Sequence, residues 1–569
     1  YQVSCPHPEN HYFCVCLMVQ NWSAPGLELK MPVWTPGSYL IREYSRHLQD
    51  LRAEDGHGKA RSAVKLAKNH WQIDSAGVTE IKITYRVYAY ELSVRTNHLD
   101  GSHGYFNGAA LFLAAAGYED HPLTLAVIPP RPDWTVSVAL EPQTGEQFVY
   151  QVPNFDVLVD SPVEMGTQAI YEFAVRGKAH QLAVWGEGNL DPERLIPDLE
   201  QIIETEAEIW GELPYERYLF ILHLSSQGYG GLEHRDSCTL NYSRFGFREP
   251  EKYQRFLQLA AHEFFHLWNI KRLRPIALET FDYYQENYTP SLWFAEGVTS
   301  YYDLLIPLRA GRYDVLTFLK NLSKEISRYR LTPGRLVQPL AESSFDAWIK
   351  LYRRDNHSDN CQMSYYLKGE LLTLMLDLLI RRRHGNQRSF DDVLRSLWRR
   401  FGQGEQGFQE AELEAIIGEV ASADLADFWQ EYLYGLTELP LEDYLEPFGL
   451  VLTPQYDDPA PYFGAKLQPE GGRVKVKFVA VGSPAEQAGL SCEDELLALN
   501  GFKISAETFN QRLQDFQPQD WVKITYFHQD CLQTVSAQLQ APQPSRHEVS
   551  TIPHPSPQQS ALLRGWLEA

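Results

Sequence analysis

The sequence lacks the features that mark several classes of protein. Its seven cysteines are odd in number and no pair has zinc-finger spacing, so a disulfide framework is not expected. Acidic residues outnumber basic ones by 74 to 51, and the net charge of −23 disfavours nucleic acid or an anionic membrane as the main partner. No apolar run approaches the roughly 20 residues of a membrane-spanning helix. The chain starts at Tyr1 without a visible secretory signal, so we expect a cytoplasmic protein.

The length and the patterning predict several domains. A chain of 569 residues is too long for one hydrophobic core. Residues 1–180 alternate apolar and polar side chains, which predicts an N-terminal β-sandwich-like domain. Residues 181–450 change to helical patterns and predict an α+β domain that is mostly α. Short strands return in residues 451–541, and residues 542–569 are expected to be an extended linker whose end docks on the body through Trp566.

The start of the middle region shows its elements most clearly. Asp191 to Gly211 predicts a helix with an acidic outer face, and Tyr218 to Leu224 predicts a short buried strand. A Gly-rich loop and a second strand near Thr239 are expected to follow. Helical patterns then dominate from residue 250 to about residue 435.

The strongest motif is HEFFH, from His262 to His266. Helical residues four apart lie on one face, so two imidazoles with this spacing can hold one zinc ion. Glu263 lies beside the first histidine and can act as general base toward a water on the metal. The alternative is a chance match on a core helix.

A second motif, WFAEG, supplies the third ligand. Glu296 lies thirty residues after His266, among apolar residues near the start of another helix. A lone carboxylate buried there would be costly unless it were paired or metal-bound. With Glu296 as a ligand, the site is a two-His-one-Glu zinc site with an open fourth position. The alternative is a partly exposed glutamate at a helix start.

With these residues in view, the chain resembles the glycyl aminopeptidase family of gluzincin metallopeptidases, metallopeptidase family sixty-one. The resemblance covers nearly the whole chain and implies a thermolysin-like catalytic domain. It rests on four motifs: PVWTPGSY from Pro32, GGLEH from Gly230, HEFFHLWNIKRLRP from His262 and WFAEG from Trp293. The chain differs from many gluzincins at Ser300, where they have an Asp that orients a zinc-bound histidine. We expect Thr299 or Asp303 to make that contact here, unless the surroundings of the zinc ligands differ.

The resemblance implies further site residues. Aminopeptidase relatives hold the α-ammonium group of the substrate at the position of Gly230, Gly231 and Glu233. The resemblance implies that the Glu233 carboxylate binds this group. The alternative is that Glu233 is a solvated charge in a loop. Tyr366 takes the position of the tyrosine that donates a hydrogen bond to the oxyanion, with Tyr365 as the adjacent alternative.

The C-terminal region is similar to a PDZ domain of the bacterial protease type. Phe463 and Gly464 would lie in its carboxylate-binding loop, where backbone N–H groups capture the C-terminal end of a peptide. The alternative is a PDZ fold that braces the protein without binding a ligand.

These features predict a zinc-dependent aminopeptidase with one Zn²⁺ per chain. His262, His266 and Glu296 hold the ion, Glu263 is the base, and Tyr366 stabilises the oxyanion. The family suggests a preference for small N-terminal residues, Gly or Ala. The rival interpretations are a zinc endopeptidase and a peptide-binding scaffold acting through the PDZ domain. The sequence does not indicate an oligomeric state.

Overall fold

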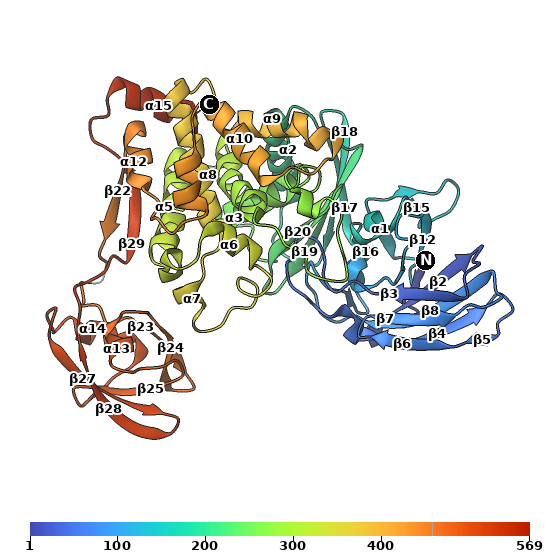
Figure 1. Ribbon diagram of the computed structural model, residues 1–569, viewed down its shortest axis with the longest axis horizontal. Coiled ribbons are helices and arrows are strands. Elements are labelled where there is room, and N and C mark those ends of the chain that lie inside the picture. Colours follow the sequence, from blue (N-terminus) through green and yellow to red (C-terminus); the bar gives the residue numbers. More distant parts are fainter. Residues whose placement is uncertain (458, 569) are drawn as a thin grey trace. The chain divides into compact units, whose positions relative to one another are not determined.

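The structure, a computed structural model, describes residues 1–457 and 459–568. Contacts group the chain into two units (Figure 1). The first comprises Tyr1–Thr289, Leu305–Arg312 and Asp391–Ile416, and the second comprises Pro290–Leu304, Tyr313–Phe390 and Ile417–Ala569. No helix within the described part of the chain combines the length and the apolar character needed to cross a membrane.

The N-terminal region forms two sheets around one core. Alternating residues of β2 and β8 are buried, as in a strand with one face inward. Their apolar side chains share a core cluster with those of β3 and β7, which makes the region sandwich-like. One sheet has the strand order β14 (Glu141–Pro142), β15 (Val149–Val152), β12 (Leu123–Ile128), β1 (Gln2–Ser4), β2 (Tyr12–Gln20), β8 (Glu80–Tyr88), β4 (Leu48–Asp55), β5 (Ala60–Arg61). The other has the order β11 (Ala114–Ala115), β3 (Gly26–Lys30), β7 (His70–Asp74), β6 (Ala63–Ala67).

A third sheet and a five-stranded sheet complete the strands of the first unit. The third sheet has the order β13 (Thr135–Ser137), β16 (Val163–Gly166), β10 (His103–Phe106), β9 (His98–Leu99). The five-stranded sheet has the order β17 (Ala169–Val175), β18 (Lys178–Trp185), β19 (Arg217–Ser225), β21 (Ser237–Ser243), β20 (Tyr229–Glu233). The expected domain boundary at residue 180 lies within β18, which pairs with β19.

Two long helices pack on the five-stranded sheet. α2 (Pro192–Trp210) contacts β17, and α3 (Pro250–Phe265) contacts β20 and β21. The expected helix after Asp191 is confirmed: Asp191 caps its first turn, and Gly211 ends it in the left-handed conformation at a φ of 93°. The prediction that this Gly-rich segment is a loop is wrong for residues 229–233, because they form β20 at the end of the sheet.

The helical part of the second unit is built around α8. The buried helix expected around Leu371 to Ile380 is confirmed as part of it. Ser364 caps its start and Gly385 ends it at a φ of 57°. The helices from residue 290 to residue 445 are η5 (Trp293–Val298), α4 (Thr299–Arg309), α5 (Val315–Arg330), α6 (Leu340–Phe345), α7 (Ser358–Cys361), α8 (Tyr365–His384), α9 (Phe390–Arg400), α10 (Glu410–Ala421), α11 (Ala426–Phe428) and α12 (Leu441–Leu445), of which α9 and parts of α4 and α10 belong to the first unit.

A two-stranded ribbon brackets the PDZ domain. β22 (Leu450–Gln455) pairs antiparallel with β29 (Arg546–Thr551), side by side in Figure 1. Serines of α5 accept hydrogen bonds from backbone N–H groups of β29, with Ser323 bonding Val549 at 2.9 Å. The extended linker expected here therefore contains a strand. Between the two strands lie β23 (Ala465–Glu470), β24 (Arg473–Val479), α13 (Pro484–Gln487), β25 (Glu495–Leu499), β26 (Phe502–Lys503), α14 (Ala506–Leu513), β27 (Trp521–His528) and β28 (Cys531–Gln538).

The expected docking of the C-terminal segment is confirmed. It forms α15 (Pro557–Leu567), and the Trp566 side chain is fully buried. The Trp566 indole donates a hydrogen bond of 2.9 Å to the Tyr301 hydroxyl on α4, and Tyr301 in turn donates one of 2.6 Å to Asp377 on α8. Ala569, the end of the predicted segment, lies outside the described residues.

Candidate active site

The two histidines of the HEFFH motif lie at the end of α3. The helix begins at Pro250, buries Phe256, Leu257 and Phe264, and ends at Phe265, so His266 is its C-cap residue. The Nε2 atoms of His262 and His266 lie 3.1 Å apart. The expected helical placement of the motif is confirmed, and both imidazoles face one point.

A backbone carbonyl fixes the ring of His266. The Nδ1 atom of His266 lies 3.0 Å from the carbonyl oxygen of Asn269. A carbonyl only accepts, so Nδ1 carries the proton and Nε2 presents a lone pair, the form of histidine that binds metals. Sequence analysis looked to Thr299 or Asp303 for such a contact. The Thr299 hydroxyl donates a hydrogen bond of 2.7 Å to the carbonyl of Ala295, and a contact of Thr299 or Asp303 with a zinc-bound histidine stays a prediction.

Two glycines let η5 pack closely against α8. A Cβ on Gly297 would lie 2.5 Å from the Cα of Gly369, and a Cβ on Gly369 would lie 2.8 Å from the carbonyl oxygen of Trp293. This close approach sets Glu296, which is 2% exposed, near Tyr366. The glycine that follows Glu296 in the WFAEG motif is therefore explained by this packing.

The phenol of Tyr366 is suited to donate a hydrogen bond. Burial, and then the charge of Glu296, raise its pKa well above 10, so the hydroxyl keeps its proton at neutral pH. Its oxygen lies 3.1 Å from the Tyr352 hydroxyl, and its ring stacks on Tyr365 at 4.8 Å between centroids. Tyr365, the alternative candidate, is fully buried, whereas Tyr366 is partly exposed.

His262 and His266 are two of the three expected metal ligands, and Glu296, the third, belongs to the second unit. Ligands about 2.0 to 2.1 Å from a tetrahedral zinc ion are roughly 3.3 Å apart, which the spacing of the two Nε2 atoms approaches. Two imidazoles and one carboxylate are also a donor set that zinc prefers. The side chains therefore fit such an ion.

Glu263 lies against the backbone of β20. A Cβ on Gly231 would lie 2.2 Å from the Glu263 carboxyl carbon, so any side chain at residue 231 would displace this carboxylate. Glu263 is 5% exposed. Gly231 thus has a defined structural role beside the expected base. Gly230, its neighbour, has a φ of 141°, which favours glycine.

Glu233 lies against Gly37 of the PVWTPGSY motif in the N-terminal region. A Cβ on Gly37 would lie 2.5 Å from the Glu233 carboxylate, and Gly37 has a φ of 82°. Glu233 is 4% exposed, so the alternative of a solvated loop charge is wrong. The N-terminal region therefore supplies one wall around this carboxylate.

The residues after Glu233 are fixed by Asp160, which sequence analysis did not single out. Asp160 contacts His234 at 3.0 Å and Lys271 at 2.7 Å, and accepts a hydrogen bond of 2.8 Å from the Arg235 backbone N–H. Burial raises the pKa of Asp160, but Lys271 and His234 outweigh burial and hold this pKa below its usual value of 3.8. The ionised carboxylate ties the end of β20 to the segment after α3.

The expected carboxylate-binding loop lies before β23. Phe463 is 3% exposed and its ring contacts that of Phe509 on α14 at 5.2 Å, so its side chain belongs to the domain core. Gly464 has a φ of 86°, and a Cβ there would lie 2.1 Å from the Ser483 side chain. β23 is at the end of the sheet order of this domain.

Three family models match the chain. They are the Peptidase M61 N-terminal domain over residues 1–167, M61 glycyl aminopeptidase over residues 255–372, and a PDZ domain over residues 461–539. A search of curated proteins found no match.

Several solved structures are similar to the chain. An aminopeptidase N family protein from Idiomarina loihiensis is 32% identical, with a TM-score of 0.93 over 100% of this chain and 99% of that chain. An M1 zinc metallopeptidase from Deinococcus radiodurans is 13% identical, with a TM-score of 0.49 over 77% of this chain and 94% of that one. Native yeast LTA4 hydrolase is 15% identical, with a TM-score of 0.47 over 79% of this chain and 69% of that chain. The identity to the Idiomarina protein and the family models show that the chain belongs to the peptidase M61 family, as a metallopeptidase of the aminopeptidase type with a C-terminal PDZ domain.

Proposed function

We propose that this protein is a zinc-dependent aminopeptidase that removes small N-terminal residues, Gly or Ala, from peptides. The observation that carries the proposal is the 3.1 Å distance between the Nε2 atoms of His262 and His266, to which the proposal adds Glu296 as the third ligand. The match to the M61 glycyl aminopeptidase model over residues 255–372 supports the substrate class.

One zinc ion per chain is held by these three residues. When bound, the ion lowers the pKa of a water and polarises the scissile carbonyl. The hydrogen bond from His266 Nδ1 to the carbonyl of Asn269 orients the ring and selects the neutral tautomer that has its lone pair at Nε2.

Glu263 acts as general base and then as general acid. It accepts a proton from the attacking water and later passes that proton to the leaving amine. Gly231 allows its carboxylate to lie directly against β20. Tyr366, whose raised pKa keeps the phenol protonated, donates a hydrogen bond to the oxyanion that develops in the transition state.

Glu233 holds the α-ammonium group of the substrate. One buried carboxylate that faces one ammonium fixes cleavage at the first residue. The PDZ domain binds the C-terminal end of a peptide through the backbone N–H groups around Phe463 and Gly464, beside β23.

The test is hydrolysis of Gly- and Ala-anilides by the purified protein, with a chelator and with zinc added back. We expect release that the chelator abolishes and zinc restores, and Glu263→Gln should keep zinc but lose activity. A peptide with a blocked N-terminus should remain intact. Cleavage of the blocked peptide without anilide release would indicate an endopeptidase, and cleavage of neither substrate would indicate a peptide-binding scaffold.

A further inference from the structure

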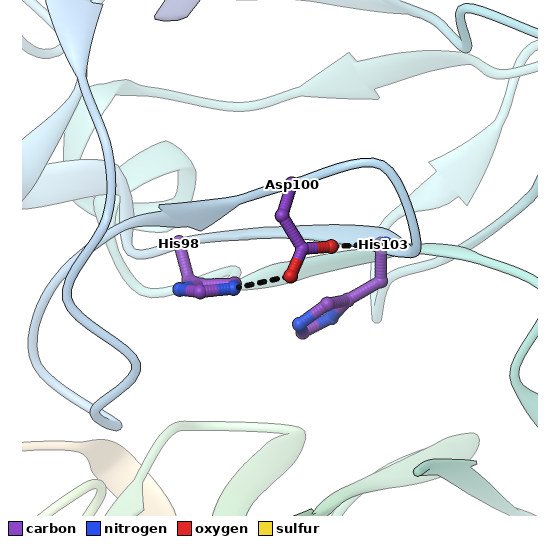
Figure 2. A group of neighbouring side chains, drawn as sticks. All are labelled: His98, Asp100 and His103. Atoms are coloured by element: carbon purple, nitrogen blue, oxygen red, sulfur yellow. Dashed lines mark hydrogen bonds and ion pairs between the residues drawn. The ribbon is translucent and has the colours of Figure 1, made fainter. Parts of the chain in front are cut away.

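A second cluster of metal-ligating side chains lies in the hairpin of β9 and β10, within the first unit. His98 pairs with Tyr105 across the two strands, and Asp100 and His103 flank the turn. One donor atom from each of His98, Asp100 and His103 lies within 4.8 Å of the others. Figure 2 shows the three side chains converging, with the Asp100 carboxylate between the two rings.

The turn directs one oxygen of Asp100 into this cluster. Its Oδ1 atom accepts hydrogen bonds from Ser102 N at 2.7 Å, Ser102 Oγ at 2.6 Å and His103 N at 3.2 Å. Its Oδ2 atom lies 3.3 Å from Nε2 of His98. Burial raises the pKa of Asp100, but the hydrogen bonds from Ser102 outweigh burial and hold it at about 2. Asp100 is therefore ionised at neutral pH.

Glu164 on β16 fixes the proton of His103. Its Oε1 atom lies 2.8 Å from Nδ1 of His103, and its Oε2 atom lies 2.9 Å from Nε2 of His223. Burial raises the pKa of Glu164, but His103 and His223 outweigh burial and lower it, so the carboxylate is ionised and only accepts. Nδ1 of His103 must then donate. Nε2 is then the ring nitrogen that is left for a metal ion.

The Nε2 atom of His103 has no hydrogen-bond partner within residues 1–457 and 459–568. His103 is fully buried, so this polar nitrogen is enclosed without a partner. A buried polar atom left without a partner is unfavourable. A histidine that is held by a carboxylate through one ring nitrogen, with the other nitrogen open, is the arrangement that metal-ligating histidines adopt.

We propose that His98, Asp100 and His103 bind a second divalent metal ion, separate from the one that the HEFFH motif holds. His98 contributes Nε2, Asp100 contributes Oδ2 and His103 contributes Nε2, while Glu164 is a positioning residue. Ligands of a tetrahedral zinc ion are roughly 3.3 Å apart, which matches the 3.3 Å between His98 and Asp100.

The donor set favours zinc or a similar first-row metal ion over magnesium or calcium. Two imidazoles and one carboxylate suit zinc, whereas magnesium and calcium prefer oxygen ligands. The Asp100 side chain is 33% exposed, which gives the ion a path from solvent and room for a water ligand.

The test is the zinc content of the full-length protein after chelation, reloading and desalting. We expect two equivalents in wild type, and one equivalent in His98→Gln, in Asp100→Asn and in the double variant His262→Gln/His266→Gln. Asp120→Asn makes the same charge change at an exposed residue of the same region and should keep two. Adding zinc to the metal-free double variant should raise its Tm, and Asp100→Asn in that background should abolish the rise.

The inference is overturned if wild type holds one equivalent that the double variant loses, or if Asp100→Asn and His98→Gln both hold as much zinc as wild type. A wild type with one equivalent that only Asp100→Asn and His98→Gln lose would support this site and count against the proposed catalytic zinc. Asp100→Asn should also leave anilide hydrolysis unchanged, because Asp100 has no role in the proposed catalytic machinery.

Discussion

At the scale of single residues, the active-site region depends on places where a side chain is missing. Gly231 leaves room for the Glu263 carboxylate, and Gly297 leaves room for the backbone of Gly369. In each case the glycine lies within two residues of a group with a proposed role: Gly231 precedes Glu233, and Gly297 follows Glu296. Gly231 therefore allows close approach of the backbone to a functional carboxylate, and Gly297 allows close approach of two helices.

Replacing Gly231 by Ala should move Glu263 and slow hydrolysis. The new Cβ would lie 2.2 Å from the Glu263 carboxyl carbon, so the carboxylate must shift. A base displaced by about 1 Å costs on the order of 100-fold in kcat. Zinc content should be unchanged.

Gly404→Ala is the matched control, since its Cβ would meet its nearest neighbour at 3.9 Å. Steady-state kinetics on Gly-anilide, with zinc content measured on the same samples, checks the prediction. Equal kcat in both variants would show that Glu263 does not depend on Gly231.

The residues that could be predicted from the sequence are those whose spacing reflects the geometry. His262 and His266 are four apart on a helix, and the structure brings their Nε2 atoms to 3.1 Å. The contact that fixes His266 could not be predicted, because it comes from the backbone carbonyl of Asn269. Any residue supplies a carbonyl, so residue identity carries no signal for it.

At the scale of elements, Asp160 joins the C-terminal ends of α1 (Phe155–Val159) and β20 to the segment after α3. It follows α1 as its C-cap residue and contacts His234 and Lys271. Lys271 is 5% exposed, so loss of the carboxylate would leave a buried ammonium group without this partner.

Asp160→Asn should destabilise the protein by about 3 kcal/mol at pH 7. The folded pKa of Asp160 is below its usual 3.8, so the stabilisation is fully present above that value and is lost as pH falls through the folded pKa. The difference in free energy of unfolding between wild type and variant should therefore narrow below about pH 3.8. Urea unfolding at pH 7 and pH 3 measures this difference.

Asp133→Asn is the control, because Asp133 is 63% exposed beside Arg131 and should change stability little. If Asp160→Asn lost the same free energy of unfolding at pH 7 and at pH 3, the assigned pKa shift of Asp160 would be contradicted.

Helices and strands with clear sequence signals could be predicted, and those without such signals could not. α2 has its cap at Asp191 and its stop at Gly211, both visible in the sequence. β20 has two consecutive glycines, Gly230 and Gly231, so it lacks the β-branched pattern of a strand. Its pairing with the next strand, β21, provides the hydrogen bonds that define it, and the search for β-branched residues does not detect such a pairing.

At the scale of the whole molecule, the PDZ domain is an insertion between two paired strands. β22 and β29 meet at Gln455 and Arg546, so the chain leaves and re-enters the ribbon at adjacent points. The domain has its own core, which includes Phe463, Phe509 and Ile524. An insertion with close ends and its own core should be removable.

Replacing residues 458–544 by a short Gly-Ser linker should leave hydrolysis of Gly-anilide unchanged. It should abolish binding of peptides with a free C-terminal carboxylate, measured by fluorescence anisotropy against the C-terminally amidated peptide. If the intact chain binds the acid and the amide equally, the role proposed for Phe463 and Gly464 is wrong.

The hydrogen bond from Trp566 to Tyr301 has a consequence for the order of synthesis. Tyr301 belongs to the same apolar segment as Glu296, yet its buried partner is made 265 residues later. The first unit can begin to fold while the ribosome is still translating the PDZ domain. The second unit completes its packing around Tyr301 only when α15 has been made, so the surroundings of Glu296 reach their final form after translation has passed residue 566.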